Sequence, residues 1–353
     1  MRVTGIISGA MKVPMAIHIY RITLPLHYID QKTKHWASWF DAKTNAMNMS
    51  PESLEVALTS DIIVLSRPIT DDFLMARKYC EMLHSRGAKI VYETDDDLSN
   101  VYRDTSNGEG ASSIPYLPYV DALTVTTEFL KNRMLEFCDK PIHVINNYVE
   151  VRFFAGASMR HKREYNDTIN VLLVGTKTHQ GDWRFAAEAI KRLTLENQNV
   201  RMLVAGYHPD YVEQGFHVDL IGSKPYNQYP TTLAEADIVV CAIDPDDPFN
   251  HCKSAVKAME AWAAKRVIGH TTGGAAVVAT DSVVYNPVVR HMRNGLICKH
   301  SVDGYYDAIK KLVEDDRLRK QLQRRGLLDI INNHNMATGY THWVNAYKKV
   351  LRS

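Results

Sequence analysis

Several polar and charged side chains lie within residues 244–272, where an apolar run is followed by an expected helix. Lys253 and Ser254 lie in the expected first turn of that helix, and Lys257 and Glu260 continue one of its faces. Backbone N–H groups at a helix N-terminus favour anionic groups, phosphates above all. A cationic start followed by a carboxylate two turns later fits a nucleotide diphosphate with its ribose diol. An amphipathic helix whose Lys257 and Glu260 pair in solvent explains the same pattern.

A second loop with ligand-binding character runs from Gly175 to Trp183, between an apolar run and a helical pattern. Loops that follow strands lie at the carboxyl edge of a parallel sheet, where open α/β folds bind ligands. The candidate ligand-binding residues of this loop are Gly175, Thr176, Lys177, His179 and Asp182. The loop matches neither a Walker motif nor GxGxxG. A helix start capped by Thr178 or Asp182 is the structural alternative.

Two further side chains could complete a nucleotide site. Asn250 precedes the cationic helix, and Tyr226 lies in a turn from which it could flank a nucleobase. A tyrosine that only packs in its turn is the more common arrangement. Nucleophilic catalysis finds no support, because the chain has no GxSxG motif and Cys252 has no evident base partner.

Three adjacent carboxylates, Asp95, Asp96 and Asp97, follow the strand pattern that ends at Glu93. Like charges this close repel each other, which raises the pKa of at least one carboxyl group or attracts a cation. Asp95 or Asp96 could act as a general base for a hydroxyl group. The cluster could instead bind a divalent metal, or hold a basic side chain such as Arg21. A helix cap and turn is the structural alternative.

Composition places the chain among ordinary globular proteins. It has 353 residues, of which 45% are hydrophobic and 23% charged, so two domains are expected. A net charge of +2 does not single out a nucleic-acid binder. The five cysteines are scattered without CxxC spacing, which favours reduced thiols over a zinc site. No apolar run reaches the ~20 residues of a membrane span, so we expect a soluble, cytoplasmic protein.

Short apolar runs alternate with helical patterns along most of the chain. This alternation predicts an α/β fold with parallel, doubly wound sheets. We expect an N-terminal domain over residues 1–155, a linker over 156–168, a second domain over 169–330 and a helical segment over 331–353. The expected strands are 3–7, 61–66, 89–93, 122–126 and 143–145 in the first domain, and 169–175, 201–206, 236–243 and 267–269 in the second.

The segment PFNHCKSAVKAMEAWAAKRVIGHTTGG, residues 248–274, resembles the donor helix of GT-B glycosyltransferases of group 1. That helix normally carries two glutamates. Glu260 matches the second, which binds the donor ribose, and the first would fall at Cys252. VGTKTHQGDW resembles a phosphate-side loop of a subgroup whose helix opens with Lys and Ser. The resemblance implies two Rossmann-like domains that face each other across a cleft, and a nucleotide-sugar donor, for which we expect a UDP-sugar.

The same resemblance implies roles for individual residues. The donor diphosphate would lie at Lys253, Ser254 and the Gly175 loop, with Lys177 and Lys253 in place of the family's usual Arg and Lys. Leaving-group stabilisation by lysines and N–H groups would replace a metal ion, so we expect no cofactor. The last helix crosses back to the first domain in many GT-B proteins.

VYETDDDL resembles a first-domain loop of GT-B enzymes and, more weakly, a loop of phage DNA β-glucosyltransferases in which an Asp is the base. Asp95 or Asp96 would take that position, with Arg21 and Asp97 on the acceptor side. Two acceptors are compatible with this resemblance: a saccharide or lipid-linked glycan, and a hydroxymethylated DNA base. The second requires base flipping and a basic groove, for which residues 160–163 and 317–325 could supply charge.

Two other functions are compatible with the sequence. The protein could bind a nucleotide sugar without turning it over, because Cys252 stands where a glutamate is expected. It could also be a metal-dependent GT-A transferase that uses Asp95–Asp97, although two sequential α/β halves argue against this. An aspartate base implies inversion, whereas the Glu260 helix resembles that of retaining enzymes. The sequence identifies neither the sugar nor the oligomeric state.

Overall fold

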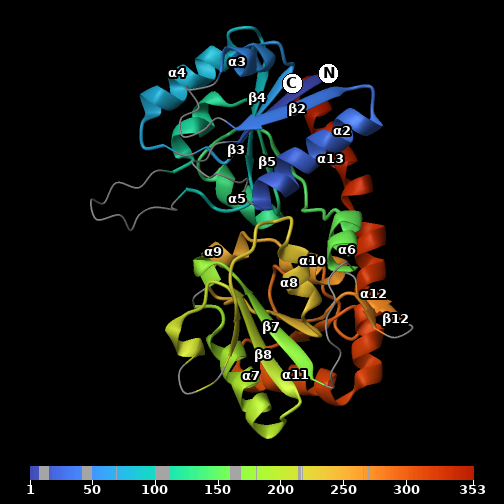
Figure 1. Ribbon diagram of the computed structural model, residues 1–353. Coiled ribbons are helices and arrows are strands. Elements are labelled where there is room, and N and C mark those ends of the chain that lie inside the picture. The colour runs from blue at the N-terminus through green and yellow to red at the C-terminus, as the bar shows by residue number, and fades with distance from the viewer. Residues whose placement is uncertain are drawn as a thin grey trace. The chain divides into compact units, whose positions relative to one another are not determined.

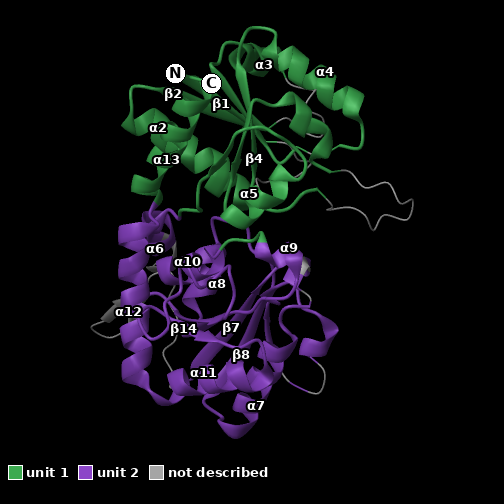
Figure 2. Ribbon diagram, turned by 180° about the vertical axis from the view of Figure 1, so that it is seen from behind, with its two compact units in different colours: residues 1–148, 252–254, 336–353 green, residues 149–251, 255–335 purple. Residues whose placement is uncertain are grey.

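The computed structural model describes residues 1–7, 16–41, 50–68, 70–99, 112–159, 168–179, 181–213, 216, 218–264, 266–268 and 271–353. The chain forms two compact units (Figure 2). Unit 1 contains Met1–Tyr148, Cys252–Ser254 and Met336–Ser353, and unit 2 contains Val149–His251 and Ala255–Asn335. Most of the expected linker, residues 160–167, lies outside the described residues.

The six strands of the unit 1 sheet are parallel and follow the order β2-β1-β3-β4-β5-β6. Their bounds are β1 (Arg2–Ile7), β2 (Trp36–Asp41), β3 (Ile62–Ser66), β4 (Lys89–Thr94), β5 (Ala122–Val125) and β6 (Ile142–Val144). Every residue of β3 and β5 is buried, because helices cover both faces of a parallel sheet. The order places the carboxyl ends of β1, β3 and β4 next to one another.

Helices supply the crossover connections that parallel strands require. Those described in unit 1 are α1 (Ala16–His18), the π-helical turn η1 (Ile19–Thr23), α2 (Leu24–Lys32), α3 (Pro51–Leu58), α4 (Phe73–His84), the 3-10 helix η2 (Ile114–Tyr119), α5 (Glu128–Leu135) and α13 (Met336–Val350). Ser50, Asp72 and Thr127 cap α3, α4 and α5 with their side-chain oxygens. α13 lies beside α2 (Figure 1) and buries Trp343 and Tyr347 in the apolar cluster there.

Unit 2 is built on a second six-stranded parallel sheet, in the order β14-β13-β10-β7-β8-β9. Its strands are β7 (Ile169–Gly175), β8 (Val200–Gly206), β9 (Asp219–Ile221), β10 (Ile238–Cys241), β13 (Ala276–Thr280) and β14 (Leu296–Cys298). Its described helices are α6 (Val151–Met159), η3 (Lys177–His179), α7 (Arg184–Glu196), η4 (Asp210–Val212), α8 (Tyr229–Ala234), α9 (Pro248–His251), α10 (Val256–Ala263), α11 (Val302–Glu314) and α12 (Asp316–Asn333). These two sheets confirm the predicted α/β class.

Two expectations about the segment after β10 are wrong. Lys253 and Ser254 do not open a helix, because α9 ends at His251 and α10 begins at Val256. Val267 and Ile268 of the expected strand 267–269 also lie outside the main sheet: β11 (Arg266–Ile268) pairs antiparallel with β12 (Thr271–Gly273), and β13 takes the place in the sheet. The chain passes so close to α10 at Gly274 that a Cβ there would lie 2.3 Å from the Trp262 carbonyl oxygen.

No helix in the described part of the chain combines the length and the apolar composition that crossing a bilayer requires.

Candidate functional site

The strand β7 of unit 2 ends at a glycine whose missing side chain lets three groups converge. A Cβ atom at Gly175 would lie 2.9 Å from Cδ2 of His179, 3.0 Å from Cζ2 of Trp183 and 3.1 Å from Nζ of Lys257. Gly206, at the end of the neighbouring β8, has a φ of +86°, and a Cβ there would lie 2.4 Å from the Gly175 carbonyl oxygen. Both positions therefore require glycine, and the Lys257 ammonium lies against the backbone of the Gly175 loop.

Lys257 is not the solvent-exposed residue that an amphipathic helix predicts. Its Nζ atom is buried, in the first turn of α10 and one turn before Glu260. Glu260 is 5% exposed, and its Oε2 atom accepts a hydrogen bond of 3.2 Å from the Tyr229 hydroxyl. Burial and the charge of Glu260 raise the pKa of Tyr229 well above its ordinary value, so the hydroxyl remains a donor. Sequence reasoning missed Tyr229, which no motif marks.

Asp182 connects two loops at the same edge of the sheet. Its Oδ2 atom bonds Nδ1 of His179 at 2.6 Å. Its Oδ1 atom accepts hydrogen bonds of 2.8 Å from the backbone N–H of Asp244 and from Nδ2 of Asn250. The structure thus brings His179, Asp182 and Asn250 together as buried residues that fix the loops. Thr176 and Lys177, by contrast, are exposed on the Gly175 loop.

Tyr226 belongs to an aromatic cluster of unit 2. Its ring stacks on Phe153 with a centroid distance of 5.1 Å and an interplanar angle of 4°. Phe154 meets Tyr226 edge-on at 5.9 Å, and Tyr229 at 6.4 Å. One face of Tyr226 is therefore covered by Phe153, which sequence reasoning did not select. Its contact with a nucleobase stays a prediction.

The residues Cys252, Lys253 and Ser254 belong to unit 1, although the chain on either side of them belongs to unit 2 (Figure 2). Cys252 is buried in the apolar cluster of unit 1, and its carbonyl oxygen accepts a hydrogen bond of 3.3 Å from Thr127. The Ser254 hydroxyl accepts one of 2.8 Å from Nδ2 of Asn147. These contacts hold the segment in a non-helical conformation and explain why α10 begins only at Val256.

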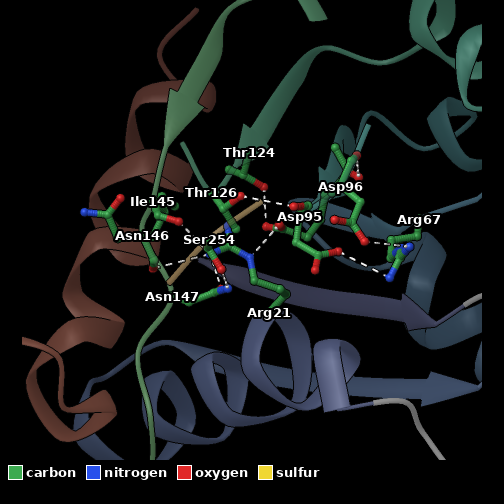
Figure 3. A network of polar contacts seen from close by, with 12 residues as sticks. Arg21, Arg67, Asp95, Asp96, Thr124, Thr126, Ile145, Asn146, Asn147 and Ser254 are labelled. Carbon is green, nitrogen blue, oxygen red and sulfur yellow. Dashed lines mark hydrogen bonds and ion pairs between the residues drawn. The ribbon is translucent and has the colours of Figure 1, made fainter. Parts of the chain in front are cut away.

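A second group of polar residues lies at the carboxyl edge of the unit 1 sheet. Asp95 and Asp96 follow β4, and both point toward Arg67, which follows β3 (Figure 3). Arg67 Nη1 lies 3.3 Å from Asp95 Oδ1, and Nη2 lies 3.4 Å from Asp96 Oδ2. The backbone of Arg67 has a φ of +50°, a strained value for a side-chain-bearing residue and one that occurs preferentially at functional sites. Sequence reasoning missed Arg67.

The carboxyl group of Asp95 holds its proton more tightly than an ordinary aspartate. Burial, followed by the negative charge of Asp96, raises the pKa of Asp95 to about 7, against the opposing effects of Arg67 and Arg21. The repulsion between adjacent carboxylates therefore contributes to a raised pKa in this cluster, as the sequence predicts. A carboxylate with this pKa is suited to general base catalysis at neutral pH.

Asp97 has different partners from Asp95 and Asp96, which both pair with Arg67. Its Oδ1 atom accepts hydrogen bonds from Ser99, and its Oδ2 atom accepts one of 2.9 Å from Nε of Arg133. Across the described ranges, no three His, Cys, Asp or Glu side chains form a group that could hold a metal ion. Metal binding by Asp95–Asp97 stays a prediction.

Arg21 bonds Glu93 rather than the three aspartates. Its Nε atom donates to Glu93 Oε1 at 2.7 Å. Its Nη1 atom donates to the Ile145 carbonyl and to Oδ1 of Asn147 (Figure 3). Arg21 and Glu93 are each 1% exposed. Thr124 donates a further hydrogen bond to Glu93. In the structure, Arg21 forms a buried ion pair with Glu93. A direct contact between Arg21 and an acceptor stays a prediction.

Comparison with known families assigns the part of the chain that contains Gly175, Asp182, Lys257 and Glu260. Residues 168–315 match the family model described as glycosyl transferases group 1. This part of the chain is similar to group 1 glycosyltransferases. The predicted resemblance to this family is confirmed over that range. No match was found among the sequences of curated proteins.

Solved structures of glycosyltransferases share the fold of the whole chain at low sequence identity. HepE from Anabaena in complex with UDP is 11% identical, with a TM-score of 0.65 over 99% of this chain and 100% of that chain. Sucrose-phosphate synthase from Thermosynechococcus elongatus is 14% identical, with a TM-score of 0.66 and full coverage of both chains. A glycosyltransferase from Rickettsia africae ESF-5 is 14% identical, with a TM-score of 0.68 over 100% of this chain and 99% of that chain.

These similarities confirm the predicted GT-B fold, and most of the residues that match the family model belong to unit 2. The weaker likeness to phage DNA β-glucosyltransferases has no support from them and stays a prediction. Of the segments with which a basic DNA groove was predicted, residues 160–163 lie outside the described residues.

Proposed function

We propose that this protein is a glycosyltransferase that moves a sugar from a nucleotide-sugar donor, a UDP-sugar, to an acceptor hydroxyl. The observation that carries the proposal is the arrangement on α10, where Lys257 lies beside Gly175 and Glu260 follows one turn later. Both lie within the residues that match the family model. The choice of UDP draws on HepE, which was solved in complex with UDP and with UDP-glucose.

Each group on α10 suits a different part of the donor. The Glu260 carboxylate would accept hydrogen bonds from the ribose hydroxyls, and the hydrogen bond from the Tyr229 hydroxyl would orient this carboxylate. Lys257 would neutralise the diphosphate together with the exposed Lys177. The N-cap residue of α10, Ala255, has no capping side chain, so the N–H groups of the first turn can bind an anion. These fixed positive groups stabilise the leaving diphosphate without a metal ion.

Asp95 or Asp96 would accept the proton of the acceptor hydroxyl, because both lie at the carboxyl edge of the unit 1 sheet. The ion pair with Arg67 keeps the two carboxylates in place. An aspartate base implies inversion at the anomeric carbon of the transferred sugar. Proton NMR of the product distinguishes this outcome from retention through the coupling constant of the anomeric proton.

A saccharide acceptor agrees better with the described residues than DNA does. The basic run 317–325 of α12 is engaged in contacts of its own helix region: Arg319 and Lys320 both pair with Asp316, at 2.6 Å. Arg319 also donates to the Leu312 carbonyl oxygen. A phosphate group that binds Arg319 or Lys320 would compete with Asp316 for these two side chains.

Thermal-shift titration with UDP-, GDP-, ADP- and dTDP-sugars, with and without EDTA, tests the proposal. We expect a UDP-sugar to raise the melting temperature, since a ligand at 100 times its Kd stabilises the fold by about 2.7 kcal/mol. We also expect the shift to survive EDTA. A shift with another nucleotide alone would overturn the choice of UDP, and one that EDTA abolishes would overturn metal independence. If a nucleotide sugar raises the melting temperature but the protein releases no UDP from it, the protein is a binding protein instead of an enzyme.

Replacement of Glu260 by alanine should weaken donor binding by about 1–3 kcal/mol, because the ribose hydroxyls lose a charged acceptor. Isothermal titration calorimetry with the UDP-sugar measures the change. Glu188→Ala removes an exposed glutamate of α7 in the same unit and serves as the matched control. Equal affinity in the Glu260 and Glu188 variants would remove Glu260 from the donor site.

A further inference from the structure

The outward face of α12 carries large apolar side chains next to arginine. α12 runs along one side of unit 2 (Figure 1), and Gly326 determines which face packs inward, because a Cβ atom there would lie 2.2 Å from Cδ1 of Trp262 in α10. The opposite face presents Arg324, Leu328 and Ile331 at i, i+4 and i+7. Leu328 is 48% exposed and Ile331 is 41% exposed, so both apolar side chains lie largely in solvent.

A turn between β13 and β14 lies against the same stretch of α12. Nη1 of Arg325 lies 3.5 Å from the carbonyl oxygen of Met292, and Nδ2 of Asn294 donates a hydrogen bond of 3.1 Å to Oδ2 of Asp329. Met292 and Arg293 are both exposed, so the turn adds one apolar side chain and one guanidinium group to those of the helix. The resulting surface, here named the α12 patch, consists of Met292, Arg293, Arg324, Arg325, Leu328 and Ile331.

The turn holds Met292 in a backbone conformation that few residues with a side chain adopt. The φ of Met292 is +61°. Its N–H donates to the Gly295 carbonyl oxygen at 2.9 Å. The buried Asn294 accepts a hydrogen bond from the N–H of Arg290 and donates one to the Val288 carbonyl oxygen. A strained conformation persists only where its surroundings enforce it, and this one keeps an apolar side chain exposed.

The two segments that form the α12 patch carry charge of one sign. Residues 282–300 contain no aspartate or glutamate, and residues 317–353 contain only Asp329. Oδ1 of Asp329 lies 3.9 Å from Nη2 of Arg290, so this carboxylate has a cation of its own. The whole chain has a net charge of only +2, which means that the positive charge is local. A local positive potential attracts anionic partners.

A bilayer that contains anionic lipids fits both properties of the α12 patch. Its phosphate groups lie at the level of the headgroups, where guanidinium groups bind them, and its acyl chains lie just beneath, within reach of apolar side chains. A nucleic acid would bind the arginines but would leave Met292, Leu328 and Ile331 in water. A second copy of this chain would bring like charges together in a twofold contact.

We propose that the α12 patch docks unit 2 on the surface of a bilayer that contains anionic lipids. Met292, Leu328 and Ile331 enter the boundary between headgroups and acyl chains, and the three arginines bind lipid phosphate groups. The contact is peripheral and reversible. The inference goes beyond the proposed glycosyl transfer and does not depend on it, because no side chain of the patch belongs to the proposed donor site or to the proposed base.

Co-sedimentation of the full chain with lipid vesicles tests the proposal. One set of vesicles contains phosphatidylcholine alone, and the other contains phosphatidylcholine mixed with phosphatidylglycerol. We expect the partition coefficient to be at least about 10-fold higher for the anionic vesicles and to fall as salt is added, because salt screens the attraction between arginines and lipid phosphates. No binding to the anionic vesicles, or equal binding to both sets, would overturn the inference. Tighter binding to a DNA duplex than to anionic vesicles, at equal phosphate concentration, would overturn the choice of a bilayer.

Replacing Arg293, Arg324 and Arg325 together by glutamine should lower the partition coefficient for anionic vesicles about 100-fold, because each arginine near an anionic surface contributes about 5-fold. All three side chains are exposed, so the substitutions remove no core packing. A triple variant that sediments with the vesicles as well as the wild type does would refute the contact between these arginines and lipid.

A second triple variant controls for the change in net charge. Glutamine at Lys32, Lys78 and Arg86 removes the same charge from exposed positions of unit 1. Its partition coefficient should stay within about 3-fold of the wild type, because the proposal gives these side chains no contact with lipid and distant charges are screened. Equal losses in the two triple variants would show that net charge alone governs binding, and would refute the α12 patch.

The apolar part of the contact has its own test. Leu328→Asn should lower the partition coefficient about 10-fold, because the bilayer no longer covers an apolar side chain. Leu195→Asn, at an exposed position of α7 in the same unit, is the matched control and should leave it unchanged. Equal binding by the two leucine variants would show that the patch does not enter the bilayer.

Discussion

Replacing Arg21 by methionine should destabilise unit 1 by about 3–5 kcal/mol, because it leaves the Glu93 carboxylate buried without its counter-charge. The two side chains are each 1% exposed and form a bond of 2.7 Å. The Asn147 side chain and the Ile145 carbonyl lose a donor at the same time. Burial already raises the pKa of Glu93 in spite of the guanidinium, so the isolated carboxyl group would take up a proton. The free energy of unfolding in urea measures the effect.

Arg77→Met provides the matched control for this prediction. Arg77 pairs with Glu81 at the same distance of 2.7 Å, but both side chains are more than half exposed, so the loss should stay within about 1 kcal/mol. Replacing Arg21 and Glu93 together by methionine should recover much of the stability, because no buried charge then remains unpaired. Equal costs for the Arg21 and Arg77 variants would show that the buried pair does not stabilise unit 1.

Replacing Asp95 by asparagine should lower kcat about 10²–10⁴-fold, the usual contribution of a general base. Because asparagine preserves the shape of the side chain, the donor thermal shift should remain. Asp71→Asn, at an exposed position before α4, is the matched control. Loss of activity in Asp96→Asn but not in Asp95→Asn would assign the base to Asp96. Wild-type turnover in both would exclude either from that role.

The raised pKa of Asp95 also predicts the pH dependence of the wild-type enzyme. A base must be deprotonated to accept a proton, so kcat should rise with pH through about 7 and level off above it. Residual activity of Asp95→Asn should lack this acidic limb. A kcat that is constant between pH 5.5 and 8.5 in the wild type would contradict the assignment.

Sequence reasoning recovers the fold because hydrophobic periodicity reports directly on secondary structure. The apolar runs at residues 61–66 and 169–175 become β3 and β7 with almost unchanged bounds. The expectation that residues 267–269 form a strand of the main sheet is wrong for a physical reason, because a short apolar run is compatible with a hairpin as well as with a sheet strand. The tertiary pairing decides between them, and β11 pairs with β12 instead of with the main sheet.

The candidate site is recovered only in part. Residues that precede or follow a strand could be placed at the sheet edge, and His179, Asp182 and Asn250 do meet there. Their partners could not be predicted, because partners depend on the order of strands in the sheet. The contact of Arg67 with Asp95 requires β3 to lie next to β4. Similarly, nothing local indicates that Ser254 bonds Asn147 and that α10 therefore begins late.

The division of the chain also determines when each unit can fold during synthesis. Unit 1 needs α13, whose Trp343 and Tyr347 complete its core, whereas unit 2 is complete at Asn335. The 187 residues from 149 to 335 must leave the ribosome before α13 does, which takes ~10–40 s at about 5–20 residues per second. The N-terminal strands therefore emerge first but finish folding last. During that interval their apolar surfaces stay incompletely covered, and a chaperone that shields nascent chains would raise the yield of native protein.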